Sequence, residues 1–123
     1  MEITPNVEDM ILHAEGKALA TYGKHGINVV PVSTVRIKDG KILLMNYFFK
    51  KTLDNIIDNK SISLSCWRGL EGYQIKGQVE YVDTGDQFEE ARAWINNNVP
   101  NRILLGLLII LPIEIHNISP GAN

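Results

Sequence analysis

Two lysines and a threonine, Lys50, Lys51 and Thr52, follow the aromatic segment "NYFF" and begin a stretch with helical spacing. The first turn of a helix carries unpaired backbone N–H groups and a partial positive charge, so lysine is normally unfavourable there. A phosphate group would reverse that effect, because anions bind readily at the start of a helix. Lys51 would add a full charge, and Thr52 would add a hydroxyl and its backbone N–H. The alternative is that both lysines are solvated loop residues.

Arg36 is the natural second contributor to such a phosphate site. It lies on a predicted strand that the hairpin turn "KDG" (38–40) connects to the strand "KILLMNYF" (41–48), so we expect it near the same rim. A guanidinium group donates two hydrogen bonds to a phosphate at once. The alternative is that Arg36 is a cross-strand charge partner.

The segment is not a P-loop, because the glycine-rich run that precedes Lys-Thr in that motif is absent. The aromatic residues that stand there suit a flat ring better than a nucleoside triphosphate. No other cluster of residues indicates catalysis. The three histidines, His13, His25 and His116, lack metal-ligand spacing. Cys66 falls on the apolar side of an alternating segment, which favours a small buried residue over a nucleophile. If the protein does chemistry, we expect a bound cofactor to carry it.

The whole chain suits a single domain, residues 1–123, with one core. Its net charge of -2 provides no overall basic field for nucleic acid or a membrane surface. The single cysteine excludes an internal disulfide, and the acidic, polar N-terminus does not resemble a signal peptide, so we expect a cytoplasmic protein. The apolar run from Ile103 to Ile115 is too short to cross a membrane as a helix and favours a buried strand.

The hydrophobic pattern predicts a mainly β protein, a six-stranded antiparallel barrel with helices packed outside. The predicted helices lie between Pro5 and Gly16, at 51–59 and at 86–97, and the predicted strands at 17–22, 27–37, 41–48, 61–67, 72–83 and 102–116.

Local signals add detail to these elements. Gly16 is expected to end the first helix in a left-handed cap. Leu53, Ile56 and Ile57 are expected to form the inward face of the second helix. Pro31 marks the strand that contains it as an edge strand or the site of a bulge.

Four ordered strings resemble the pyridoxamine 5′-phosphate oxidase-like, FMN-binding split-barrel family, and its short single-domain members most closely. They are "PVSTVRIKDGKILLMNYFFKKTLDNI" (31–56), "GYQIKGQVEYVDTGDQFEEARAWI" (72–95), "VPNR" (99–102) and "EIHNISPG" (114–121). No single string is decisive, but the ordered set is fairly specific. The resemblance covers essentially the whole chain from the first helix to Asn123.

This resemblance implies a redox flavoprotein that forms a homodimer, with FMN bound in grooves at the subunit interface. In such proteins the segment matching Lys51 and Thr52 holds the FMN phosphate, and the strand matching 31–36 lies along the flavin. Gln74 would lie near the ring, contributed by its own subunit or by the partner. The residues implied in FMN binding are Lys51, Thr52, Arg36, Val32, Ser33, Thr34, Pro31, Asn46, Tyr47, Lys50 and Gln74.

Some features depart from the family pattern. Short members often have glycine where this chain has Lys50, and asparagine where it has Tyr47. The chain ends at "HNISPGAN", without the basic C-terminal portion that holds substrate phosphate in the oxidase of vitamin B6 metabolism. This argues against oxidation of pyridoxamine phosphate itself.

The apolar segment 103–111 offers a surface for the dimer, although it could instead be the central strand of a monomeric barrel. Other cofactors also remain open, because some relatives of this fold use the deazaflavin F420 or haem. His116 is the one histidine at a strand end suited to haem ligation. A non-catalytic module that stores flavin or transfers electrons is also compatible with the sequence.

Overall fold

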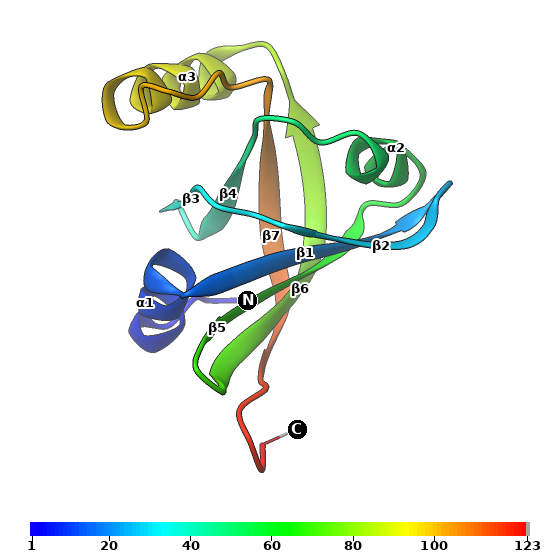
Figure 1. Ribbon diagram of the computed structural model, residues 1–123, viewed down its shortest axis with the longest axis vertical. Coiled ribbons are helices and arrows are strands. Elements are labelled where there is room, and N and C mark those ends of the chain that lie inside the picture. The colour runs from blue at the N-terminus through cyan, green and yellow to red at the C-terminus, as the bar shows by residue number, and fades with distance from the viewer. Residues whose placement is uncertain (123) are drawn as a thin grey trace.

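The computed structural model describes residues 1–122 and contains one antiparallel sheet with three helices around it (Figure 1). The helices are α1 (Pro5–His13), α2 (Lys51–Asp58) and α3 (Asp86–Asn98), and the strands are β1 (Gly16–Gly23), β2 (Gly26–Pro31), β3 (Val35–Lys38), β4 (Lys41–Asn46), β5 (Ser61–Arg68), β6 (Glu71–Val82) and β7 (Gly106–Asn117). Within residues 1–122, no helix has the length and apolar character needed to cross a membrane.

The sheet is an open barrel whose two edges are consecutive in the chain. Its strand order is β2-β1-β5-β6-β7-β4-β3, so β2 and β3 form the edges and only residues 32–34 connect them. Figure 1 shows this connection crossing in front of the sheet. Val32 N donates to Lys17 O of β1 (3.1 Å), and Met45 N of β4 donates to Thr34 O (3.2 Å). Because such a short segment bonds to both ends of the sheet, the sheet must curl until its edges approach each other.

The predicted fold class is confirmed, but residues 1–122 form seven strands where the sequence predicted six. The single strand expected at 27–37 is divided at 32–34, where the backbone leaves β1 and begins to pair with β4. Pro31, which has no N–H to donate, is the last residue of β2. Its position on an edge strand agrees with the prediction.

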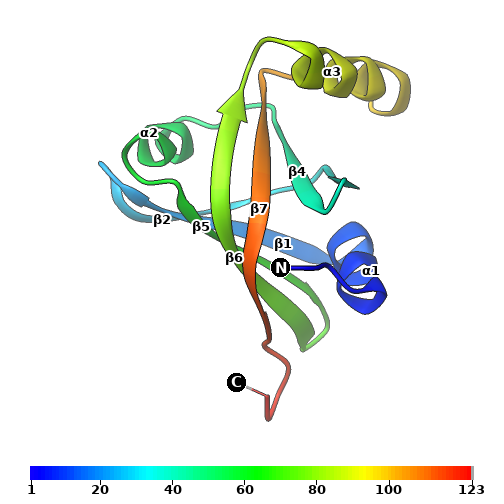
Figure 2. The same ribbon diagram turned by 180° about the vertical axis from the view of Figure 1, so that it is seen from behind.

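The core lies on both faces of β4 and β7. Leu44 and Leu108 point into the barrel, towards α1 and α2, and both are fully buried. Leu43 and Leu107 point to the other face, where Phe88 and two other residues of α3 cover them. Figure 2 shows α3 at the end of β7 away from α1. Burial on both faces explains why these strands are continuously apolar rather than alternating.

Most of the apolar segment 103–111 is therefore buried inside the chain rather than offered to a partner. Leu107 to Ile110 are at most 4% exposed, as expected of a central barrel strand. Only Ile103, Leu105 and Leu111 are substantially exposed. The strand itself begins at Gly106 rather than Arg102, because a turn closed by the bond from Arg102 N to Val99 O follows α3 and residues 103–105 lead from it into the strand.

Two local predictions were wrong. Ile57 is 75% exposed, because the buried face of α2 is formed by Thr52, Asn55 and Ile56, which lie on one side of the helix. Gly16 does not cap α1; it begins β1, where a Cβ atom would clash with the ring of Trp67.

Candidate functional site

The loop from β4 into α2 is shaped by the side chain of Asn46. Its Oδ1 accepts hydrogen bonds from the backbone N–H groups of Phe48 (3.1 Å) and Phe49 (2.7 Å), and its Nδ2 donates to the Tyr81 hydroxyl (3.0 Å). Asn46 is 1% exposed. Since its amide is occupied at both ends by the protein, the structure gives Asn46 the role of directing the chain into α2.

The start of α2 concentrates positive charge. Lys50 is its N-cap and Lys51 its first residue, and no side chain within residues 1–122 caps the helix. Both lysines are exposed and take part in none of the ion pairs formed among these residues. By contrast, α1 and α3 carry carboxylates in their first turns. The one carboxylate in the first turn of α2, Asp54, is paired with His25. The lysines and the helix dipole therefore both favour an anion here.

Thr52 is held in place at this helix start by Asn28 of β2. The Thr52 side chain is 1% exposed, and its Oγ1 accepts a hydrogen bond from Asn28 Nδ2 (3.2 Å). Because the oxygen is the acceptor in this bond, the hydroxyl proton remains available for donation. Asn28 was not among the predicted site residues. Its amide in the otherwise apolar segment "INVVPV" was the available sequence signal.

A second buried amide fixes α2 to the β1–β2 hairpin. Asn55 is fully buried; its Nδ2 donates to Thr21 Oγ1 (3.1 Å) and Gly26 O (3.0 Å), and its Oδ1 accepts from His25 N (2.9 Å). All polar atoms of this amide are therefore engaged. The hairpin and the helix start form one unit.

The predicted flavin-binding strand lies alongside the loop that leads into α2. Tyr47 donates its hydroxyl proton to Thr34 Oγ1 at 2.7 Å. Together with the bond at Thr52, this contact brings segment 28–34 beside segment 47–52. The structure thus assembles the two main segments of the predicted site, although they pair with different strands of the sheet.

Residues 29–33, together with the start of β1 and Trp67, line a groove of about 620 Å³, and no residue of α2 lines it. Pro31 and Ser33 are exposed, while Val32 packs on the barrel core. The Lys17 amino group lies 3.4 Å from Ser33 O, and Trp67 forms part of the groove wall. The groove is mainly apolar with a cation beside it.

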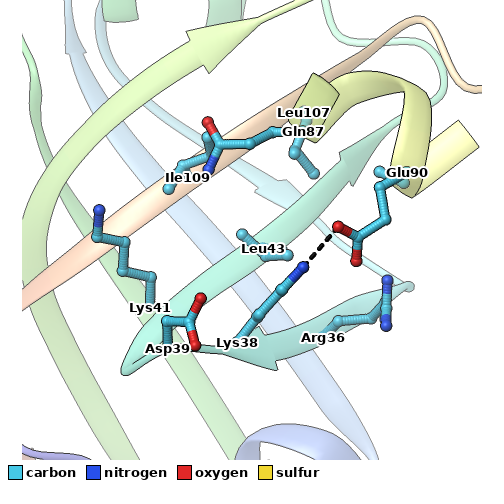
Figure 3. Close-up of a pocket in the computed structure, with 10 residues that line it drawn as sticks. Arg36, Lys38, Asp39, Lys41, Leu43, Gln87, Glu90, Leu107 and Ile109 are labelled. Atoms are coloured by element: carbon cyan, nitrogen blue, oxygen red, sulfur yellow. Dashed lines mark hydrogen bonds and ion pairs between the residues drawn. The ribbon is translucent and has the colours of Figure 1, made fainter. Parts of the chain in front are cut away.

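Arg36 lies elsewhere. Its guanidinium carbon is 4.6 Å from the centre of the Trp94 ring, and it lines a pocket between the β3–β4 hairpin and α3 (Figure 3). Strand alternation explains this, because Val35 and Ile37 pack on the barrel core and Arg36 must point to the opposite face. Within the chain, Arg36 and Lys51 therefore do not lie at one site as the sequence predicted.

Gln74 lies on β6, outside the groove. Its Nε2 donates to Ser63 Oγ (3.1 Å), and it lines a polar hollow together with His116. Within one chain Gln74 does not join the α2 site. Its contact with a flavin bound by the partner subunit stays a prediction.

His25 lowers the pKa of Asp54 from its ordinary value of 3.8, mainly through the hydrogen bond from Nε2 to Oδ2 (2.8 Å). The stabilisation from this pair is present above the ordinary pKa of aspartate and is lost as the pH falls through the lowered pKa. We expect an NMR titration to give Asp54 a pKa below 3.8 in the native protein and to return it towards that value in His25→Ala. Identical Asp54 titrations in the two proteins would contradict the contact.

Burial raises the pKa of the Cys66 thiol to about 12. Cys66 is fully buried, as the sequence predicted, and both its burial and the raised pKa disfavour the reactive thiolate at neutral pH. We expect a thiol reagent such as DTNB to label the native protein far more slowly than the protein unfolded in urea. Equal labelling rates would show that Cys66 is accessible.

An open antiparallel barrel with α2 beginning beside its split edge places this chain in the split-barrel class. The sequence pattern of the pyridoxamine 5′-phosphate oxidase family matches residues 3–118, and the chain belongs to this family. A curated relative, the uncharacterised protein MJ0282 of Methanocaldococcus jannaschii, is 29% identical over 94% of this chain and 83% of its own length.

Solved structures share the fold. HupZ of Group A Streptococcus superposes with a TM-score of 0.85 and 26% identity, covering 98% of each chain. An FMN-binding protein of Syntrophomonas wolfei gives 0.78 and 14% identity, covering 92% of this chain and 84% of the other. The haem storage protein HutZ of Vibrio cholerae gives 0.70 and 11% identity over 94% of each chain. An F420 reductase gives 0.69 and 13% identity, covering 92% and 98%. These last three likenesses concern the fold alone.

Proposed function

We propose that this protein is an FMN-binding flavoprotein with a redox role. The observation that carries the proposal is the start of α2, where an exposed lysine and an uncapped helix terminus lie next to a buried, positioned threonine hydroxyl. A phosphate monoester matches this combination of positive charge and hydrogen-bond donors. The FMN-binding neighbour of the same fold adds support.

The residues present fit the parts of FMN. Lys51 and the backbone and hydroxyl of Thr52 would hold the phosphate. The segment of Val32, Ser33 and Thr34, with its adjoining groove, would lie along the ribityl chain and the ring. When bound, FMN supplies electron transfer to and from a substrate or protein partner. The chain itself would bind the cofactor and orient it against the split edge.

A homodimer is part of the proposal. On the edge strand β2, Ile27 is 80% exposed and Val29 is 60% exposed. Natural sheets rarely leave apolar edge strands uncovered. A second copy seated there would cover them and would close the groove next to Pro31. Gln74 of that copy would then be available to the flavin ring. The cytoplasmic location stays a prediction.

Haem is the second candidate. Two observations favour it, the likeness to the haem storage protein HutZ and an exposed histidine near a strand end. His116 lies in a polar hollow that Lys76 also lines, and its Nε2 is 3.2 Å from Glu114 Oε1. Imidazole is a common axial ligand, and lysine would pair with haem carboxylates. The same barrel would also serve a protein that binds a deazaflavin, or one that stores flavin.

Parallel titrations with FMN, riboflavin and haem test the proposal. We expect FMN to bind at least about tenfold more tightly than riboflavin, because only FMN carries the phosphate that α2 recognises. Fluorescence quenching of the flavin measures both affinities. Equal affinities would show that the start of α2 does not bind the FMN phosphate. A haem Soret band without flavin binding would show that the cofactor is haem and not FMN.

A further inference from the structure

A second pocket lies between the β3–β4 hairpin and α3, separate from the start of α2 (Figure 3). Its volume is about 220 Å³, room for a single ring rather than a whole cofactor. Its floor is apolar. Leu43, Ala91, Leu107 and Ile109 line it, and each is at most 7% exposed. The FMN proposal assigns no role to this pocket.

The walls of the pocket are preformed. Asp39 and Gly40 have φ angles of 51° and 74°, the left-handed values that a tight two-residue hairpin requires. Pairing of Leu43 with Ile109 joins the hairpin to β7. Ala91 and its neighbours on α3 pack on the same face of the sheet. A ligand would therefore find the pocket already shaped, which lowers the cost of binding.

The rim is basic although the whole chain carries a net charge of -2. Arg36, Lys38 and Lys41 stand around the pocket, against the carboxylates of Asp39 and Glu90. Only Lys38 has an ion-pair partner among residues 1–122, and Arg36 instead rests on the Trp94 ring. Arg36 and Lys41 therefore leave positive charge on the rim that no carboxylate among residues 1–122 pairs with.

The partner of Lys38 shows which chemistry the rim recognises. Lys38 Nζ lies 2.5 Å from Glu90 Oε2, so the hairpin already binds a carboxylate that α3 presents (Figure 3). This hydrogen bond is the main reason why the pKa of Glu90 lies below its ordinary value. Both side chains are about half exposed, so another carboxylate can compete with Glu90 in water.

We propose that this pocket binds a small organic carboxylate with a flat apolar body. The carboxylate takes the place of Glu90 beside Lys38, and the apolar body lies on the floor formed by Leu43 and Ile109. Binding here is independent of flavin. The site would take a substrate or an effector of this chemical class.

The test is a titration with benzoate, followed in two-dimensional NMR spectra of the full chain. We expect saturable shifts at Leu43, Ala91 and Ile109 with a dissociation constant of about 1 mM, since the ligand is small and the rim is hydrated. Benzyl alcohol, which has the same ring without the charge, should bind much more weakly. Absent or non-saturable shifts, or shifts elsewhere on the molecule, would overturn the proposal.

Two variants should move the affinity in opposite directions. Glu90→Gln removes the competing carboxylate and releases Lys38, so benzoate should bind about fivefold more tightly. Lys38→Met keeps the length of the side chain but loses its charge, so binding should weaken about fivefold. Glu89→Gln is the matched control, because Glu89 pairs with Arg92 within α3 and does not line the pocket. If both pocket variants bind benzoate like the wild type, recognition of the carboxylate by this rim is disproved.

Discussion

Replacing Lys51 with alanine is expected to weaken FMN binding roughly tenfold to a hundredfold. A hydrogen bond from a charged donor contributes about 1.5–3 kcal/mol, and about 1.4 kcal/mol corresponds to a factor of ten in affinity. The lysine is exposed and forms no ion pair among residues 1–122, so its removal should leave the fold intact. Fluorescence titration of wild type and variant measures the difference.

Riboflavin and a second lysine provide the controls for Lys51→Ala. Riboflavin lacks the phosphate, so its affinity should not change in the variant. Lys60→Ala removes the same charge from an exposed position beyond the other end of α2 and should leave FMN binding unchanged. Loss of FMN and riboflavin affinity to the same extent would mean that Lys51 acts on the fold of the site and not on the phosphate. Unchanged FMN affinity would remove Lys51 from the site.

Replacing Asn55 with alanine is expected to lower the free energy of unfolding by about 2–4 kcal/mol. The change leaves the buried Thr21 hydroxyl without its partner, and it also removes two part-buried hydrogen bonds, to Gly26 O and from His25 N–H. Each unsatisfied buried group costs about 1–3 kcal/mol, partly offset where water enters. Urea denaturation followed by circular dichroism measures the effect.

Asn97→Ala is the control for Asn55→Ala, because Asn97 is an exposed residue of α3. Its replacement should change stability by less than about 0.5 kcal/mol. The Asn55 variant should also bind FMN less tightly, since Asn55 joins the hairpin that carries Asn28 to the helix that carries Thr52. Wild-type stability of the Asn55 variant would show that the buried amide does not hold these elements together.

The order of helices and strands could be predicted because it depends on local periodicity. Ile62, Leu64 and Cys66 alternate onto the buried face of β5 as expected. The division of the strand at 32–34 could not be predicted, because apolar residues continue through it and the break is set by pairing with β1 on one side and β4 on the other. Gly16 was misread for the same reason. The ring that excludes a side chain there belongs to Trp67, which is distant in sequence.

The residues of the candidate site also differ in whether the sequence could identify them. Lys51 and Thr52 were identifiable from local spacing, since a helix start can be read from a few residues. Asn28 and Asn55 were missed because their roles depend on partners that the fold brings from other elements. Within the chain Arg36 lies away from Lys51, and strand alternation with its apolar neighbours explains why it points to the face that α3 covers.

The most direct test of the central claim is the visible absorption spectrum of the protein purified from cells, with the released cofactor identified by mass. We expect a flavin spectrum and FMN in near-stoichiometric amount, held by the phosphate site at Lys51 and Thr52. A colourless protein that also fails to take up added FMN would contradict the account. The two lysines at the start of α2 would then be ordinary solvated residues.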